Sequence, residues 1–144
     1  MFELSAIQSL LEDSGIEIYQ VHQHGQRHEI EVAERVRLHM MDSGVRVDVD
    51  DQLTLRFSAR AQRSDAPSAD AAQLFERVQA AVGVPVMARG FEERERRTVE
   101  IKDPVDESKV LDVWYEIVFA KTCDQDQLVE ELRWVMDLER YVEG

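Results

Sequence analysis

Two neighbouring stretches of alternating apolar and polar residues constrain the fold of this chain more than any other feature. Every second residue is apolar in residues 45–49 and again in residues 53–59, and a polar segment with two aspartates separates the stretches. Successive side chains of a strand point to opposite faces, so this alternation is typical of strands with one dry face and one wet face. The aspartates at 50–51 predict a tight turn, and the two strands are therefore expected to pair as an antiparallel hairpin.

The residues before this hairpin extend the same pattern. Residues 16–21 are expected to be extended, the His-Gly-Gln sequence at 24–26 favours a turn, and apolar residues then return at even positions. Residues 29–41 fit either a strand or a helix, because some of their apolar residues are also spaced by four. Their alternation and β-branched residues favour a strand. The Asp-Ser-Gly sequence at 42–44 predicts another turn.

Three segments have the apolar spacing of helices. The first is residues 2–14, which precede a glycine. The second is expected to begin at Ser68 as its N-cap and to end at Gly83. The third is expected to follow Asp124, which together with Gln127 has the form of a capping box.

The second half of the chain contains further strand candidates. Residues 84–88 and 98–102 are expected to be extended, and the charged residues 91–97 are expected to contain a turn. The sequence at 110–120 is the most apolar of the chain and has apolar residues on both faces, which predicts a central strand covered on both sides.

These elements predict a single α+β domain over residues 1–144, with helices packed on an antiparallel β-sheet. Their order is helix, three or four strands, helix, two or three strands, helix. An alternative begins at Leu53, where the elements could form a ferredoxin-like βαββαβ unit with the first 50 residues as an N-terminal extension.

The charge of the chain excludes some classes of function. Thirty Asp and Glu residues against seventeen Lys and Arg residues give a net charge of -13. Because nucleic-acid phosphates and anionic lipids repel such a protein, neither nucleic acid nor a membrane is an expected partner. The N-terminus shows no basic stretch followed by a long apolar run, so we expect no signal peptide and a cytoplasmic location.

The sequence Trp-Tyr-Glu-Ile-Val-Phe-Ala at 114–120, followed by the helix at 125–141, ends this series of elements. The element order, in an acidic chain of this length, resembles the type III secretion chaperone-like fold that the YbjN-like family shares. The resemblance implies a dimer that holds a partner polypeptide in extended form on apolar patches. It therefore implies binding rather than catalysis.

Three histidines surround the turn at 24–26 and are the candidate metal ligands. His22 and His24 are expected to point to the same side of a strand, a spacing that can hold a metal, and His28 returns on the partner strand. The simpler interpretation is a polar hairpin tip that exposes its histidines.

Two further features have simple structural interpretations. Residues 92–97 mix both signs of charge, which favours a solvated strand edge over a charged docking site. Cys123 precedes the last helix, has no histidine assigned as its base, and is expected to be an inert or partly buried thiol.

The function favoured by these observations is a non-catalytic protein-binding module, chaperone- or adaptor-like, acting as a homodimer. Its partner-binding residues are expected to be Trp134, Leu138 and Tyr141, because the apolar stripe of the last helix is too broad for one contact face. No catalytic residue and no cofactor are expected, since no motif for either occurs. The alternative is a small-molecule-binding or enzymatic domain, with a pocket between sheet and helices lined by His22, His39 and strand arginines.

Overall fold

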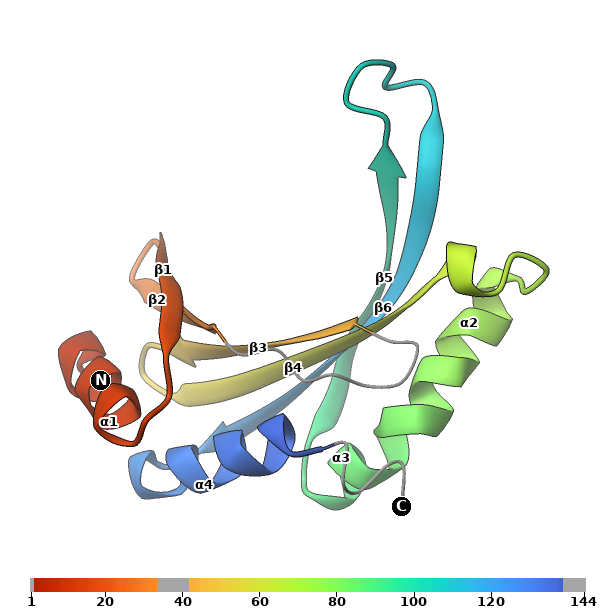
Figure 1. The fold of residues 1–144 in the computed structure, drawn as a ribbon. Coiled ribbons are helices and arrows are strands. Elements are labelled where there is room, and N and C mark those ends of the chain that lie inside the picture. The colour runs from red at the N-terminus through yellow and green to blue at the C-terminus, as the bar shows by residue number, and fades with distance from the viewer. Residues whose placement is uncertain (1, 34–41, 139–144) are drawn as a thin grey trace.

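The chain folds as a six-stranded antiparallel sheet with helices on one face (Figure 1). This computed structural model describes residues 2–33 and 42–138. The strands are β1 (Ile18–His24), β2 (Arg27–Val32), β3 (Asp42–Val49), β4 (Leu53–Gln62), β5 (Glu92–Lys102) and β6 (Val110–Cys123). The helices are α1 (Leu4–Asp13), α2 (Ala71–Val78), α3 (Val84–Ala88) and α4 (Gln125–Met136), with the 3-10 turn η1 (Arg63–Asp65) and the π-helical turn η2 (Gln79–Gly83). The predicted α+β class and element order are confirmed.

The strands lie in the order β1-β2-β3-β4-β6-β5. The first four form a meander, whereas β6 inserts between β4 and β5 and pairs antiparallel with both. β4 and β5 are therefore parallel to each other, as in a split βαβ unit. The ferredoxin-like alternative does not describe the sheet. In that alternative both neighbours of β4 would come from the βαββαβ unit that begins at Leu53, whereas here one neighbour is β3, which belongs to the N-terminal meander.

The predicted alternation is confirmed in β3 and β4. In β4 every odd residue from Leu53 to Ala61 is buried and every even residue is half-buried. The buried side chains meet the inner faces of the helices, and the core includes Ile7 and Leu11 of α1, Leu74 and Val78 of α2, and Leu128, Leu132 and Val135 of α4. The helices thus use the dry face of the sheet, and the wet face carries the polar residues.

Three turn and cap predictions are wrong in detail. Residues 42–44 do not turn but begin β3, because they pair with residues 58–60 of β4 and so satisfy their backbone groups in the sheet. Residues 91–97 contain no turn; β5 begins at Glu92 and has only a bulge before Glu95. The N-cap of α2 is Asp70 rather than Ser68.

The strand predicted at 84–88 is a helix. The chain does not leave the helical conformation at Gly83, because the π-helical turn η2 joins α2 to α3. Pro85 lies in the first turn of α3, and Val86 is fully buried. Tertiary packing therefore overrides the extended pattern of Val-Pro-Val.

Other expectations hold. Gly25 has a φ of 64° in the turn between β1 and β2, a conformation that favours glycine. Asp124 and Gln127 form the predicted capping box at the start of α4. Residues 29–32 are strand, and the undecided residues 34–41 lie outside the described part. β6 is an interior strand, and its residues 116–120 are buried on both faces as predicted, although the described helices cover only one of these faces.

Candidate functional site

The wet face of the sheet carries a concentration of paired charges, and we call this surface the ionic face. Alternation in β2, β3, β4, β5 and β6 brings its residues side by side across the strands. Its charged members include Arg27, Glu29, Glu31, Arg46, Asp48, Arg56, Arg60, Arg97 and Glu116. Helices cover the opposite face of the sheet (Figure 1).

Glu29 is the centre of the first cluster. Arg46 Nη1 donates to Glu29 Oε1 at 2.9 Å, and Arg56 Nη2 donates to Glu29 Oε2. The Glu29 side chain is only 6% exposed. Burial alone would raise the pKa of Glu29, but attraction to Arg56 and Arg46 outweighs it and lowers this pKa below its usual value. Glu29 is therefore an ionised carboxylate shared by two arginines.

Asp48 lies beside this cluster, but its pKa is shifted in the opposite direction to that of Glu29. Its Oδ2 is 3.0 Å from Arg56 Nε and 3.4 Å from Arg27 Nη1. Within the described residues its other oxygen, Oδ1, is buried without a hydrogen-bond partner. Burial raises the pKa of Asp48 above its usual value despite attraction to Arg56 and Arg27. The ionised form of Asp48 is thus less well satisfied than that of Glu29.

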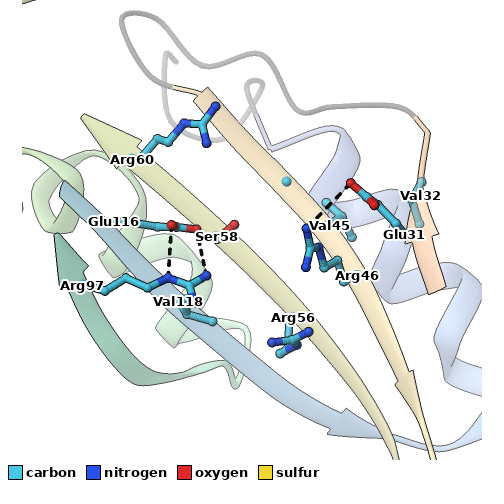
Figure 2. A pocket seen from close by; sticks show the side chains of 11 residues that line it. Glu31, Val32, Val45, Arg46, Arg56, Ser58, Arg60, Arg97, Glu116 and Val118 are labelled. Atoms are coloured by element: carbon cyan, nitrogen blue, oxygen red, sulfur yellow. Dashed lines mark hydrogen bonds and ion pairs between the residues drawn. The ribbon is translucent and has the colours of Figure 1, made fainter. Parts of the chain in front are cut away.

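The second cluster joins β4, β6 and β5. Arg97 Nε donates to Glu116 Oε2 at 3.2 Å and Nη2 donates to Oε1 at 3.4 Å, the forked geometry of a bidentate pair (Figure 2). This hydrogen bond raises the pKa of Arg97. Arg60 lies directly across the sheet from Glu116, and its guanidinium stacks 3.7 Å from the centre of the Trp114 ring.

A hollow of about 200 Å³ lies between the two clusters. The hollow exists because the side chains between the arginines are small. Gly44 has no side chain, and Ser58, which lies opposite it on β4, has a short one. The guanidinium-bearing residues around it are Arg46, Arg56, Arg60 and Arg97. Figure 2 shows Ser58 between the Arg97–Glu116 pair and the side chains of β3.

This hollow differs in place from the pocket that the sequence predicted. The sequence placed a pocket between sheet and helices, whereas the hollow lies on the other face of the sheet. Strand arginines line it, His22 is not among its lining residues, and His39 lies outside the described residues. The pattern Arg-Phe-Ser-Ala-Arg at 56–60 signals wet-face arginines with a gap between them. It cannot show which other strands come to lie beside them.

The histidines lie near the ionic face. His22 and His24 point the same way, as predicted, with ring centres 6.3 Å apart. Each faces a different acid: His22 Nε2 is 3.2 Å from Glu31, and His24 Nε2 is 3.9 Å from Glu29. His28 neighbours Glu29 on the strand and so belongs to the opposite face. No group of three His, Cys, Asp or Glu residues in the described chain could hold a metal ion.

The residues predicted to bind a partner have different environments. Trp134 is half-buried, with its ring stacked on Phe91 at 6.4 Å and Arg89 placed over it at 5.2 Å. Leu138 is fully buried and belongs to the core. Tyr141 lies outside the described residues. Within the described residues, Trp134 and Leu138 therefore do not form an exposed patch.

The cysteine is buried at the end of β6. Burial, with a further contribution from Glu131, raises the pKa of the Cys123 thiol to about 11. The thiol is therefore protonated near neutral pH, which agrees with the expectation of an inert cysteine.

Comparison with known proteins adds no further constraint. No known family model matches the chain, and no match is found among the curated proteins or the solved structures. None of the helices within residues 2–33 and 42–138 has the length and hydropathy required to cross a membrane. The fold and site define an α+β protein with an arginine-lined ionic face.

Proposed function

We propose that this chain is a non-catalytic, cytoplasmic protein-binding module that acts as a homodimer, with a chaperone- or adaptor-like role. The observation that carries the proposal is the charge order of β5, which forms one edge of the sheet. Residues 92–97 read Glu-Glu-Arg-Glu-Arg-Arg. If the order of these six residues is reversed and the sign of every charge is changed, the same series of charges results. Such a series complements a second copy of itself running antiparallel.

Pairing of two β5 strands about a two-fold axis between residues 94 and 95 places every charge of this segment opposite a charge of the other sign. Each glutamate then lies opposite an arginine of the other copy, in the pairs Glu92–Arg97, Glu93–Arg96 and Arg94–Glu95. Opposite charges on directly facing residues contribute about 0.2–1 kcal/mol per pair relative to apolar alanines. The contact is isologous, so each pair occurs twice and the contributions add.

The bulge in β5 makes this pairing consistent with the faces of the sheet. In a regular strand, residues whose numbers differ by an odd value lie on opposite faces. Here Arg94 has no register partner on β6, so Glu92 and Arg97 lie opposite Ala120 and Glu116 and share one face. Glu93 and Arg96 share the other face, and Arg96 Nε donates to Glu93 Oε1 at 2.7 Å. Both outer pairs would therefore meet on matching faces.

A dimer of this kind has a consequence for partner binding. The two-fold axis is perpendicular to the sheet, so the two ionic faces form one continuous surface on the same side. The β5–β6 hairpin projects from the body of each protomer (Figure 1) and carries exposed Val105 and Leu111. The continuous ionic surface and the exposed apolar residues of the hairpin support the proposal that the dimer binds an extended polypeptide.

The mass in solution, measured by light scattering after size exclusion, tests the dimer. We expect wild-type dimers that weaken in high salt, because exposed charge pairs are screened. Arg94→Glu places like charges opposite each other twice and should give monomers. The swap Arg94→Glu with Glu95→Arg restores the complementary order and should restore the dimer.

The control is Arg77→Glu, which makes the same change of net charge at an exposed residue of α2. It should leave the dimer intact. A monomeric wild type, or a swap variant no more dimeric than Arg94→Glu, would contradict the proposal.

A further inference from the structure

We infer that the free edge of β5 at residues 98–102 binds one strand of a partner polypeptide in which apolar and basic residues alternate. This inference rests on the proposed protein-binding function and names its partner class, but it does not require the dimer. Residues 98–102 continue the edge strand beyond the charged series at 92–97. In the proposed dimer Thr98 would lie opposite Phe91 of the second copy, which is outside β5, so this part of the edge stays open.

The first argument is the number of strands in the β5–β6 hairpin. β4 pairs with β6 only as far as Trp114, so residues 110–113 of β6 pair with β5 alone and the hairpin projects as a two-stranded ribbon (Figure 1). Two-stranded ribbons are marginally stable in water, and a third strand stabilises them. On the β6 side the turn η1 already contacts the ribbon, because Ser64 donates to Asp112 through its backbone N–H at 3.1 Å and its hydroxyl at 2.8 Å. The edge of β5 is therefore the side where a third strand can be added.

The second argument is the pattern of side chains along this edge. Val99 and Trp114 are opposite each other in the register and lie on the ionic face. Ile101 lies on the same face because it is two residues further along the strand, and all three side chains are half-buried. Glu100, between Val99 and Ile101, points to the opposite face and is exposed. An added strand would meet apolar residues on one face and an acid on the other, which favours alternating apolar and basic residues.

The third argument is the charge of the hairpin, which is not balanced as that of the ionic face is. Residues 98–112 contain five acids, at 100, 103, 106, 107 and 112, and two lysines, at 102 and 109. Among the described residues, no ion pair joins the carboxylates of Glu100 and Glu107. The same hairpin exposes the apolar side chains of Val105 and Leu111, which are 95% and 51% exposed. The hairpin therefore attracts a partner with lysines or arginines and repels an acidic one.

Nuclear magnetic resonance of the isotopically labelled full chain tests the site with three short synthetic peptides. The first alternates four lysines with three valines, the second has the same residues without alternation, and the third has glutamate in place of every lysine. We expect the first to shift the amide resonances of residues 98–102 and to slow their hydrogen exchange, because backbone hydrogen bonds form at this edge. The other two should bind at least about tenfold more weakly. No shift at residues 98–102 with the first peptide, or equal shifts with the second, overturns the inference.

Two matched variants of exposed acids locate the site. Glu100→Lys reverses the charge at the centre of the edge and should weaken binding of the alternating peptide by at least about threefold. Glu76→Lys makes the same change of net charge on α2 and should bind this peptide as the wild type does. Equal binding by the two variants would overturn the assignment to this edge.

The light-scattering mass of the same samples separates this inference from the dimer. A dimer that does not bind the alternating peptide overturns the inference and leaves the dimer. A monomer that binds the peptide contradicts the dimer and supports the inference. A wild-type mass above that of a dimer, without peptide binding, would show that a further copy of the chain occupies this edge, and would also overturn the inference.

Discussion

Glu29 and Asp48 provide a test of the ionic face because both contact Arg56, but their surroundings shift their pKa values in opposite directions. Glu29 is a buried carboxylate whose pKa is lowered by its arginines, whereas burial raises the pKa of Asp48. The matched changes are Glu29→Gln and Asp48→Asn, which both remove one negative charge with little change of shape. We expect the first to destabilise the protein strongly and the second to have little effect.

The magnitude for Glu29→Gln follows from what surrounds it. The amide oxygen of glutamine can accept from one arginine, but its NH₂ group then faces the guanidinium of the other. Breaking a fully buried ion pair costs about 3–5 kcal/mol. Arg46 is 45% exposed and Arg56 25% exposed, so both recover part of their hydration. We therefore expect a loss of about 2 kcal/mol, or roughly 6 °C in the melting temperature of a chain of this size.

Asp48→Asn should change the free energy of unfolding by less than about 0.5 kcal/mol at pH 7, or raise it slightly. The reason is that a raised pKa means that folding disfavours the ionised form of Asp48. Its buried Oδ1, which lacks a partner within the described residues, is consistent with this cost.

Urea unfolding at pH 7 and at a series of lower pH values measures both effects. Glu29 has a lowered pKa, so its stabilisation is complete above its unfolded-state value of 4.5 and is lost as the pH falls through the folded value. The difference between wild type and Glu29→Gln should therefore shrink in acid. For Asp48 the sign is reversed: its unfavourable contribution develops as the pH rises from 3.8 through the raised folded value. An Asp48→Asn loss at pH 7 equal to that of Glu29→Gln would refute the reasoning.

Three further predictions concern other parts of the fold. Asp124→Ala removes the capping box of α4 and should lower the free energy of unfolding by about 1 kcal/mol in urea titrations, while Asp124→Asn should retain most of it. Gly90 has a φ of 102°, so Gly90→Ala should cost about 1–2 kcal/mol by the same measurement, and a neutral effect would contradict the assigned backbone. The Cys123 thiol, with its pKa raised to about 11, should react with a disulfide reagent at pH 8 far more slowly in native protein than in urea, and equal rates would show that it is accessible.

The parts of the fold that the sequence predicts correctly are those that depend on neighbours in the chain. The alternation in residues 45–59 is a local property and identifies β3 and β4. The capping box at Asp124 also involves residues three apart. The strand predicted at 84–88 failed because Val86 is held in the core as part of a helical segment that continues from α2. That packing depends on α2 and the core, so it cannot be predicted from residues 84–88 alone.

The ionic hollow could be predicted only in part, for a related reason. The even residues Arg56, Ser58 and Arg60 show a wet face with two arginines and a gap. The residues that complete the hollow come from other strands, and Gly44 and Arg97 reach it only through the register of β3 with β4 and of β5 with β6. Register between distant strands is set by the whole sheet, and no short motif records it.

The insertion of β6 between β4 and β5 also determines how the chain must assemble. The hairpins β1–β2, β3–β4 and β5–β6 close over short segments, whereas β4 and β6 join residues such as Leu53 and Cys123 from opposite halves of the chain. Closing a loop of about 50–70 residues costs entropy before its contacts form, so this docking step should limit the folding rate. Until it occurs, the long apolar β6 has only β5 beside it, and the slow step is also the one in which the chain is most exposed to aggregation.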